Sequence, residues 1–210
     1  MKTIRTKVYE FNELNDKAKQ TAISQYRDKD RDYQFFYDEL ISSVKKVVEL
    51  FNLKLGREWT DIRTSHIDDT ICELSGVRLY KYILNNYGED LFKPLYIKSI
   101  DRPVKWKQFI CKVHKGNSGE YTILYSKYKT DNSCPLTGVY YDNDILHPVY
   151  SFLSRPEKST TFESLISEVE SAIKKTFDDT EEWVNSDEFI SKEIQANKYN
   201  FTKDGKIFNN

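Results

Sequence analysis

Hydrophobic residues recur at helical spacing along much of this chain, with polar residues at the positions between them. The strongest stripe follows Ser159-Thr160-Thr161, which can cap a helix, and acids occupy the opposite side of that helix. Asn15 is a natural N-cap for a helix near the start of the chain. The predicted helices cover residues 16–27, 33–51, 70–87, 142–152, 162–177 and 186–197, and Trp183 and Val184 are assigned to the last of them.

Glycine and proline set the expected limits of three of these helices. Gly56 should stop the second helix, and Gly88 should end the third. Pro148 should be tolerated only near the first turn of its helix or at a break.

Strand patterns are concentrated in the middle of the sequence. Residues 104–114 and 120–129 are rich in β-branched and aromatic residues and flank a turn cluster at 115–119, which predicts a β-hairpin over 104–129. Shorter strands are expected over residues 3–11 and 58–63, and Asp204-Gly205 predicts a turn in a small hairpin near the end of the chain.

These elements predict one compact α+β domain spanning residues 1–210. In this interpretation the N- and C-terminal helices pack on a small antiparallel sheet that contains the 104–129 hairpin. Three sub-regions follow along the chain: a helical part at 1–90, a basic hairpin part at 93–130 and an acidic helical part at 157–210.

Composition changes this picture in two ways. Only 39% of the residues are hydrophobic but 14% are aromatic, so the core must depend on large rings. The sequence contains no apolar run of membrane-spanning length, and its first residues lack a secretory signal pattern. We therefore expect a bacterial cytoplasmic location and no membrane partner. The three cysteines have no CxxC spacing, which favours free thiols over disulfides or a zinc site.

Charge is strongly segregated along the chain. Between Lys93 and Lys129 nine lysines and arginines stand against two acids, whereas between Glu157 and Glu193 eleven acids stand against four lysines. Such opposite fields select partners by sign, which favours a charged macromolecule as the partner over a small molecule.

The basic region interleaves lysines with aromatic rings. Lysines neutralise phosphates, and rings such as Trp106 and Tyr128 can stack on unpaired bases. The alternative is a solvated face or a strand edge protected by lysines. The candidate residues for contact with a partner or nucleic acid are Lys105, Trp106, Lys107, Lys112, Lys115, Lys127, Tyr128 and Lys129.

The acidic region offers a second candidate surface. It can match the basic sheet within the molecule, or act as a nucleic-acid mimic that occupies a basic channel of a partner; the alternative is an exposed acidic face without a partner. The candidate residues are Glu168, Asp178, Asp179, Glu181 and Glu182.

Residues 65–69, Ser-His-Ile-Asp-Asp, are the strongest candidate for a catalytic cluster in the sequence. His66 and Asp68 alternate as a metal site requires, and Asp142, Asp144 and His147 would complete a nuclease-like site. The alternative, which we favour, is that Asp68 and Asp69 begin the next helix and His66 is a loop residue.

Thiol catalysis and cofactor binding have weaker support. Cys134 or Cys111 could pair with His114 or His147, but a cysteine inside a strand is usually buried and inert. Fixed-spacing metal motifs and glycine-rich phosphate loops are missing from the sequence, so we expect neither a metal nor another cofactor.

Two segments resemble one known group of proteins. Residues 9–27, beginning Tyr-Glu-Phe-Asn-Glu-Leu-Asn-Asp, and residues 183–205, beginning Trp-Val-Asn-Ser-Asp-Glu, resemble the ends of a family of small phage and mobile-element accessory proteins. Many members carry a glycine-rich, tryptophan-containing segment after the second helix, whereas residues 61–69 here lack those glycines. The resemblance implies a phage or prophage source and an anti-CRISPR-like or antitoxin-like role; it carries no catalytic residues over.

The resulting prediction is a phage-derived, non-enzymatic binding protein. It would inhibit a nucleic-acid-targeting defence complex of the host by occlusion, with a host protein or ribonucleoprotein as its partner. The first alternative is a nucleic-acid-binding regulator or antitoxin that uses the basic hairpin. The second is a metal-dependent nuclease or hydrolase centred on His66, Asp68 and Asp69.

Overall fold

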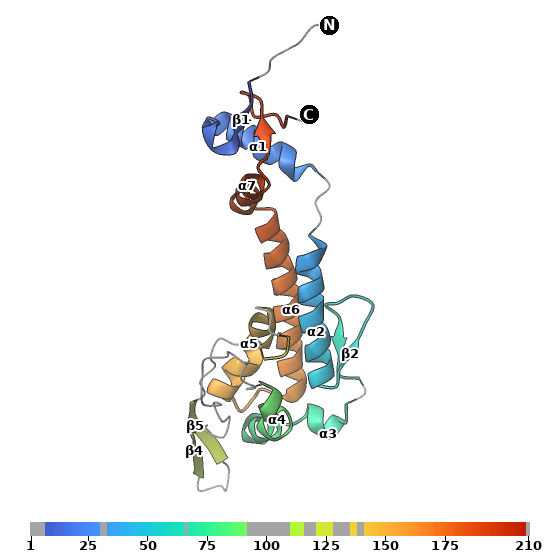
Figure 1. The fold of residues 1–210 in the computed structure, drawn as a ribbon. Coiled ribbons are helices and arrows are strands. Elements are labelled where there is room, and N and C mark those ends of the chain that lie inside the picture. The colour runs from blue at the N-terminus through green and yellow to red at the C-terminus, as the bar shows by residue number, and fades with distance from the viewer. Residues whose placement is uncertain are drawn as a thin grey trace. The chain divides into compact units, whose positions relative to one another are not determined.

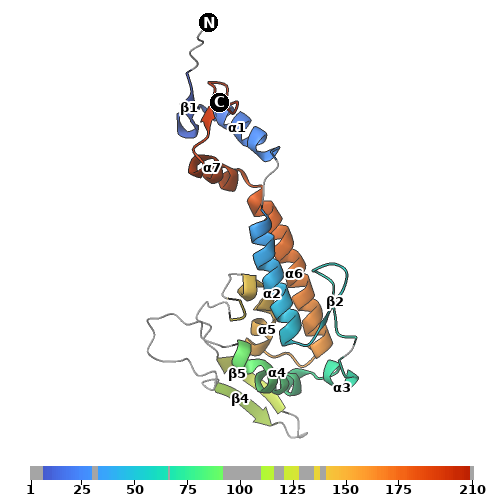
Figure 2. The ribbon, with the colours of Figure 1, turned by 45° about the vertical axis from the view of Figure 1, so that its right-hand side comes forward.

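The computed structural model describes residues 7–29, 33–65, 67–91, 110–115, 121–127, 135–137 and 141–208. Helices dominate the described part of the chain (Figures 1 and 2). They are the 3₁₀ helix η1 (Phe11–Glu13), α1 (Asp16–Arg27), α2 (Gln34–Leu50), α3 (Asp69–Cys72), α4 (Gly76–Leu91), α5 (Tyr141–Ser154), α6 (Phe162–Val184) and α7 (Asp187–Ala196). The strands are β1 (Tyr9–Glu10), β2 (Lys54–Leu55), β3 (Ile62–Arg63), β4 (Ile110–Lys115), β5 (Tyr121–Lys127) and β6 (Asn200–Phe201).

The chain divides into two compact units. Unit 1 combines both ends of the sequence, Met1–Phe35 and Asp178–Asn210, and unit 2 is Phe36–Phe177. The mixture of helices with small antiparallel strand pairs is consistent with the predicted α+β class. The single compact domain stays a prediction, because the contacts within the chain separate it into these two units.

The core of unit 1 joins α1 to α7. Asn15 caps α1 by accepting a hydrogen bond from the Ala18 amide at 2.9 Å, which confirms the predicted cap and helix start. The buried face of α1 contacts residues of α7 and Phe201 of β6. The residues fully or nearly buried in this core are Phe11, Leu14, Ala18, Ala22, Ile23, Tyr26, Ile190, Ile194 and Phe201.

The two ends of the chain pair as strands in unit 1. β1 runs antiparallel to β6 with Tyr9 opposite Phe201, and Phe201 also bridges to Ile207 (Figure 1). The second pairing confirms the predicted terminal hairpin around Asp204-Gly205. Within the described residues, the strand predicted for 3–11 is limited to Tyr9–Glu10.

The core of unit 2 is built on α6. Thr161 and Ser164 cap this helix reciprocally, because each side-chain oxygen accepts a hydrogen bond from the other residue's amide, at 3.1 and 2.9 Å. The predicted stripe, from Phe162 through Val169 to Ile173, is buried against α2, α4 and α5. Phe51 and Phe162 meet edge to face at 6.3 Å, so aromatic rings supply the volume that the low aliphatic content requires.

Several helix limits differ from the sequence prediction. The helix predicted over 162–177 continues as α6 to Val184, so Trp183 and Val184 belong to α6 and not to the last helix. The segment predicted as one helix over 70–87 forms α3 and α4, because Gly76, the first residue of α4, takes a positive φ of 51°. Helix α4 then continues through Gly88 to Leu91, which is buried and accepts a hydrogen bond from the Tyr150 hydroxyl at 3.0 Å. Helix α2 ends at Leu50, well before Gly56. Asn52, two residues after Leu50, adopts a φ of 51° and ends the helix in place of the glycine.

Pro148 lies inside α5, contrary to the prediction that it would stand at a first turn or a break. Proline removes one helical hydrogen bond and costs about 3 kcal/mol in a helix interior. The neighbouring residues Ile145, Leu146 and Val149 are fully buried. Burial of three aliphatic side chains, at about 1.5–3 kcal/mol each, outweighs the proline penalty.

The remaining described strands form two further pairs. β2 pairs with β3 in a short hairpin, and β4 pairs with β5 antiparallel, which confirms strand pairing in the predicted 104–129 hairpin. β5 lies beside α4 and α5. Within the described residues the strands form three separate two-stranded pairs instead of one sheet, and most residues of the two cores come from helices.

Candidate functional site

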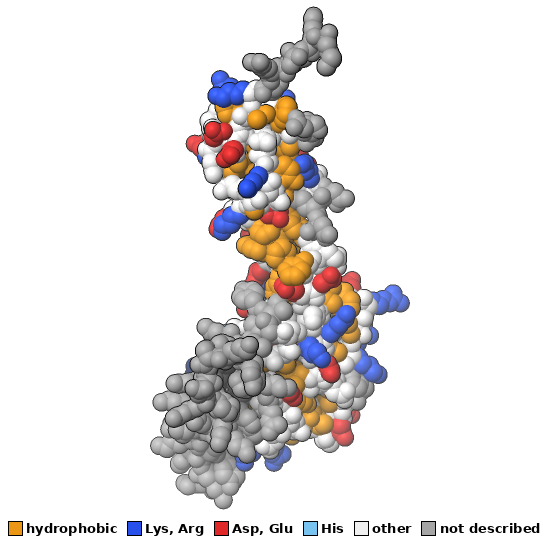
Figure 3. All heavy atoms as spheres, in the orientation of Figure 1, with side chains coloured by type: hydrophobic (Ala, Val, Ile, Leu, Met, Phe, Trp, Pro, Cys, Tyr) orange, Lys and Arg blue, Asp and Glu red, His pale blue; other side chains and the backbone are white. Residues whose placement is uncertain are grey.

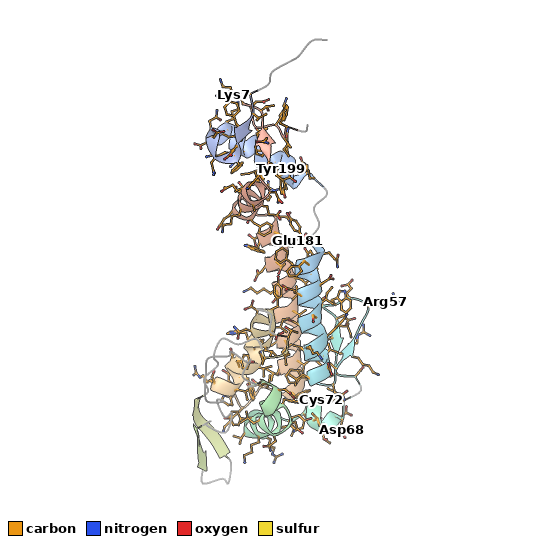
Figure 4. All side chains as sticks on the ribbon, in the orientation of Figure 1. Lys7, Arg57, Asp68, Cys72, Glu181 and Tyr199 are labelled. Atoms are coloured by element: carbon orange, nitrogen blue, oxygen red, sulfur yellow. The ribbon has the colours of Figure 1, made fainter. Side chains whose placement is uncertain are left out.

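Four carboxylates are concentrated at the C-terminal end of α6, in unit 1. Asp178, Asp179, Glu181 and Glu182 occupy the last two turns of the helix, and all four are exposed. We call this set the α6 acidic end. Figure 4 labels Glu181 on this part of α6. Four of the five predicted acidic-face residues therefore belong to one short surface.

The carboxylates of the α6 acidic end are not neutralised by ion pairs in the described part of the chain. None of its four carboxylates forms an ion pair there. Nearby acids differ: Glu188 pairs with Lys192, Asp187 pairs with Arg27, and the hydrogen bond from Lys192 lowers the pKa of Glu188. The charge of the α6 acidic end is therefore directed to the solvent.

Helix electrostatics oppose this arrangement. The C-terminus of a helix carries partial negative charge, so an anion in its last turn costs about 0.3–1 kcal/mol where a cation would stabilise. Asp178 also lies three residues before Glu181 and four residues before Glu182 on the same helix face. Each such pair of like charges lowers helix stability by about 0.2–0.5 kcal/mol. Violations of a local rule without a compensating contact are expected at functional or strained sites.

A groove of about 530 Å³ lies along this surface. Asp178, Glu181, Glu182 and Asn185 line one side at helical i, i+3, i+4 and i+7 spacing. Arg27 also lines the groove, and its guanidinium pairs with Asp187 and donates to the Asn185 carbonyl oxygen at 3.2 Å. The sequence pattern did not indicate Arg27, because α1 and α7 come together only in the tertiary structure.

Trp183 forms an aromatic ledge beside the α6 acidic end. Its indole is 50% exposed and meets the Phe189 ring edge to face, with the centroids 4.4 Å apart. Tyr33 packs on Phe189 in turn, at 5.7 Å. Figure 3 shows hydrophobic side chains gathered where α6 and α7 meet, with carboxylates at their border. Trp183 was not among the predicted site residues; its sequence signal was a large ring within a run of acids.

Glu168 is separated from the other acidic candidates. It is exposed on the part of α6 that belongs to unit 2, ten residues before Asp178. The structure therefore brings together only four of the five predicted acids in one unit.

The basic candidates are described in part. Lys112 and Lys115 lie on β4 and Lys127 on β5, and the strand register sets Lys112 opposite Tyr125 and Lys115 opposite Tyr121. Lys105, Trp106, Lys107, Tyr128 and Lys129 lie outside the described residues.

Asp68 has a structural role at the start of α3. Its carboxylate accepts hydrogen bonds from the Thr70 hydroxyl at 2.6 Å and the Thr70 amide at 2.8 Å. These bonds, the hydroxyl first, lower the pKa of Asp68. Asp69 is the first residue of the helix, which confirms the interpretation that this acidic pair begins the helix. His66 lies outside the described residues.

Asp142 is also engaged by its own surroundings. It is fully buried, and its carboxylate accepts the Leu136 amide at 2.8 Å and both the amide and the hydroxyl of Thr137. His147, on the same helix, lies within 3.3 Å of the Ser151 hydroxyl. Over the described ranges, no group of three or more His, Cys, Asp and Glu side chains has the arrangement of a metal site.

The cysteine candidates for thiol catalysis are not described at side-chain level. Cys134 lies outside the described residues, and only the backbone of Cys111 is described, on β4. For Cys72, burial and then the nearby Glu163 raise the pKa of the thiol, which disfavours the reactive thiolate.

A second groove, of about 520 Å³, lies in unit 2 between the β2–β3 hairpin and α6. Its charges are balanced: Arg63 pairs with Asp61, and Lys174 pairs with Glu170 at 2.6 Å. The hydrogen bond from Arg63 lowers the pKa of Asp61. This groove therefore lacks the single-sign field of the α6 acidic end.

No protein-family model, curated protein or solved structure matches this chain. Within the described residues, none of the helices combines the length and apolarity needed to cross a bilayer. The surfaces of the molecule therefore provide the evidence for its function.

Proposed function

We propose that this chain is a binding protein that docks the α6 acidic end onto a basic surface of a partner. The observation that carries the proposal is the set of four exposed carboxylates without ion pairs in the described residues, placed where helix electrostatics oppose them. Such a surface attracts a cationic partner and accelerates its association.

The partner class that fits best is a host nucleic-acid-targeting complex, blocked by occlusion of its nucleic-acid channel. Channels that hold nucleic acid are lined by lysine and arginine, so a concentrated acidic surface competes for the same positions. The resemblance of residues 9–27 and 183–205 to phage accessory proteins supports an anti-CRISPR-like role in the bacterial cytoplasm. The second of those segments begins directly after the α6 acidic end.

The test is inhibition of target-DNA binding by guide-loaded CRISPR effectors, measured by mobility shift across a panel of effector types. The wild-type chain should reduce DNA binding by at least one effector. A variant with Asp178→Asn, Asp179→Asn, Glu181→Gln and Glu182→Gln should lose this inhibition.

The matched control neutralises four exposed acids of unit 2: Glu58→Gln, Asp69→Asn, Glu157→Gln and Glu163→Gln. It loses the same total charge and should retain inhibition. Equal loss in both variants, or no inhibition of any effector by the wild type, would contradict the proposal.

A second candidate function is direct nucleic-acid binding by the β4–β5 hairpin. The observation in its favour is the register, which pairs Lys112 with Tyr125 and Lys115 with Tyr121. This function predicts a shift of a labelled oligonucleotide with a steep salt dependence, abolished by charge reversal at Lys105, Lys107 and Lys112. Occlusion predicts weak oligonucleotide binding.

A further inference from the structure

Trp183 is an unusual residue at an exposed position. Half of its surface is exposed, and its indole is supported by Phe189, which is supported by Tyr33. Three segments therefore contribute to one cluster of edge-to-face aromatic rings in unit 1: the residue before α2, the end of α6 and the first turn of α7. Such support limits the rotation of the indole and presents it as a fixed surface.

The surroundings of this ledge are negative. Residues 178–196 contain seven acids and one lysine. Asp179 precedes Trp183 by four residues on α6, so their Cβ atoms lie about 5–6 Å apart on the same side of the helix. A ring face in a field of carboxylates attracts a cation by two mechanisms, the ring quadrupole and the Coulomb field.

We propose that the ledge is a docking site for an arginine side chain in a basic segment of the protein partner. The guanidinium stacks on the Trp183 indole while the Asp179 carboxylate accepts its N–H groups. Charge complementarity selects a basic occupant, and ring geometry selects arginine over lysine, because a planar guanidinium stacks and donates in a fork whereas an ammonium is a strongly hydrated point charge.

This inference deepens the proposed function and depends on it. The α6 acidic end supplies attraction that does not distinguish arginine from lysine. Trp183 supplies the preference for arginine. An exposed cation–π contact corresponds to about a two- to fivefold change in affinity, which sets the size of the expected preference.

The experiment measures binding of fluorescein-labelled nona-arginine and nona-lysine peptides to the full chain by fluorescence anisotropy at one fixed low salt concentration. The arginine peptide should bind about two- to fivefold more tightly. Trp183→Leu should weaken the arginine peptide to the level of the lysine peptide and leave the lysine peptide unchanged. Trp183→Phe, which keeps a ring, should retain part of the preference.

A second readout leaves Trp183 in place. In a chain with Trp59→Phe and Trp106→Phe, Trp183 is the remaining tryptophan, and the arginine peptide should change its fluorescence emission more than the lysine peptide at equal saturation. Equal emission changes would overturn the inference even if Trp183→Leu fails to fold.

The outcomes separate the inference from the proposed function. Equal binding of both peptides, abolished by neutralising the α6 acidic end, would support the acidic docking surface and overturn the arginine site. If neither peptide bound, both the arginine site and the acidic docking surface would be overturned. Equal weakening of both peptides by Trp183→Leu would assign Trp183 a structural role and overturn the arginine site.

Discussion

The buried carboxylate of Asp142 accepts a hydrogen bond from the Thr137 hydroxyl at 2.8 Å and another from the Thr137 amide at 2.6 Å. Together with the Leu136 amide, these donors give a charged group in the interior three partners. Asp142 also lies in the first turn of α5, where the helix dipole stabilises an anion. The residue therefore attaches the 135–137 turn to the start of α5.

Asp142→Ala should lower the free energy of unfolding by roughly 2–4 kcal/mol, because it leaves three donors without their charged acceptor. Asp142→Asn should cost less, since its carbonyl oxygen keeps part of the bonding. Chemical denaturation measures both. Asp144→Ala, in the same helical turn, is the control and should cost under about 1 kcal/mol. Equal losses at both positions would contradict the role given to Asp142.

Neutralising the α6 acidic end should stabilise the protein. Each of Glu181→Gln and Glu182→Gln removes an anion from the last turn of α6 and should gain about 0.3–1 kcal/mol at low salt. Thermal denaturation at low and high salt measures the effect, which salt should reduce. The control is the same substitution at the other end of the helix: Glu163→Gln, in the first turn, should destabilise. If the substitutions at both ends of α6 changed the stability in the same direction, the helix dipole would not be the cause.

Gly205→Ala should destabilise unit 1 by about 2 kcal/mol or more. Gly205 has a φ of 86°, and a Cβ at this position would stand 2.0 Å from the Ala18 carbonyl oxygen in α1. Gly76→Ala is the matched control, since that residue also has a positive φ but its nearest contact would be 3.3 Å. Chemical denaturation should give a clearly lower free energy of unfolding for Gly205→Ala than for Gly76→Ala. Equal losses in the two variants would contradict the steric explanation.

Acid should weaken the start of α3 through Asp68. The hydrogen bonds from Thr70 lower the pKa of Asp68 in the folded state, so the folded state binds this proton less readily than the unfolded state. The stability that Asp68 contributes is therefore fully present at pH values above the ordinary aspartate pKa of 3.8. It is lost as the pH falls through the lowered pKa of the folded state.

The measurement is the stability difference between wild type and Asp68→Ala at pH 7 and at pH 2.5. The difference should be larger at pH 7. Asp69→Ala serves as the neighbouring control. A difference that grows on acidification would show that the pKa of Asp68 is raised instead.

Local patterns predicted the elements whose signals are complete within a few residues. Asn15 and the apolar positions after it defined α1, because a cap and a helical stripe depend only on neighbours along the chain. The stripe of α6 and the Asp204-Gly205 turn belong to the same class. The pairing of Tyr9 with Phe201 could not be predicted, since it joins short strands from opposite ends of the chain.

The candidate site shows the same division. The acids of residues 178–182 and their helical spacing were readable from the sequence, as was the segregation of charge along the chain. Their exposure, the absence of ion pairs to them within the described residues, and the placement of Arg27 and Phe189 nearby required the tertiary structure.

By itself the sequence determined where charge and apolar stripes fall, because these are properties of residues a few positions apart. Only the tertiary structure decided that both ends of the chain build one unit, and which carboxylates have cations within reach. The physical reason is that burial and ion pairing depend on distances in space, which residues far apart in the sequence set together.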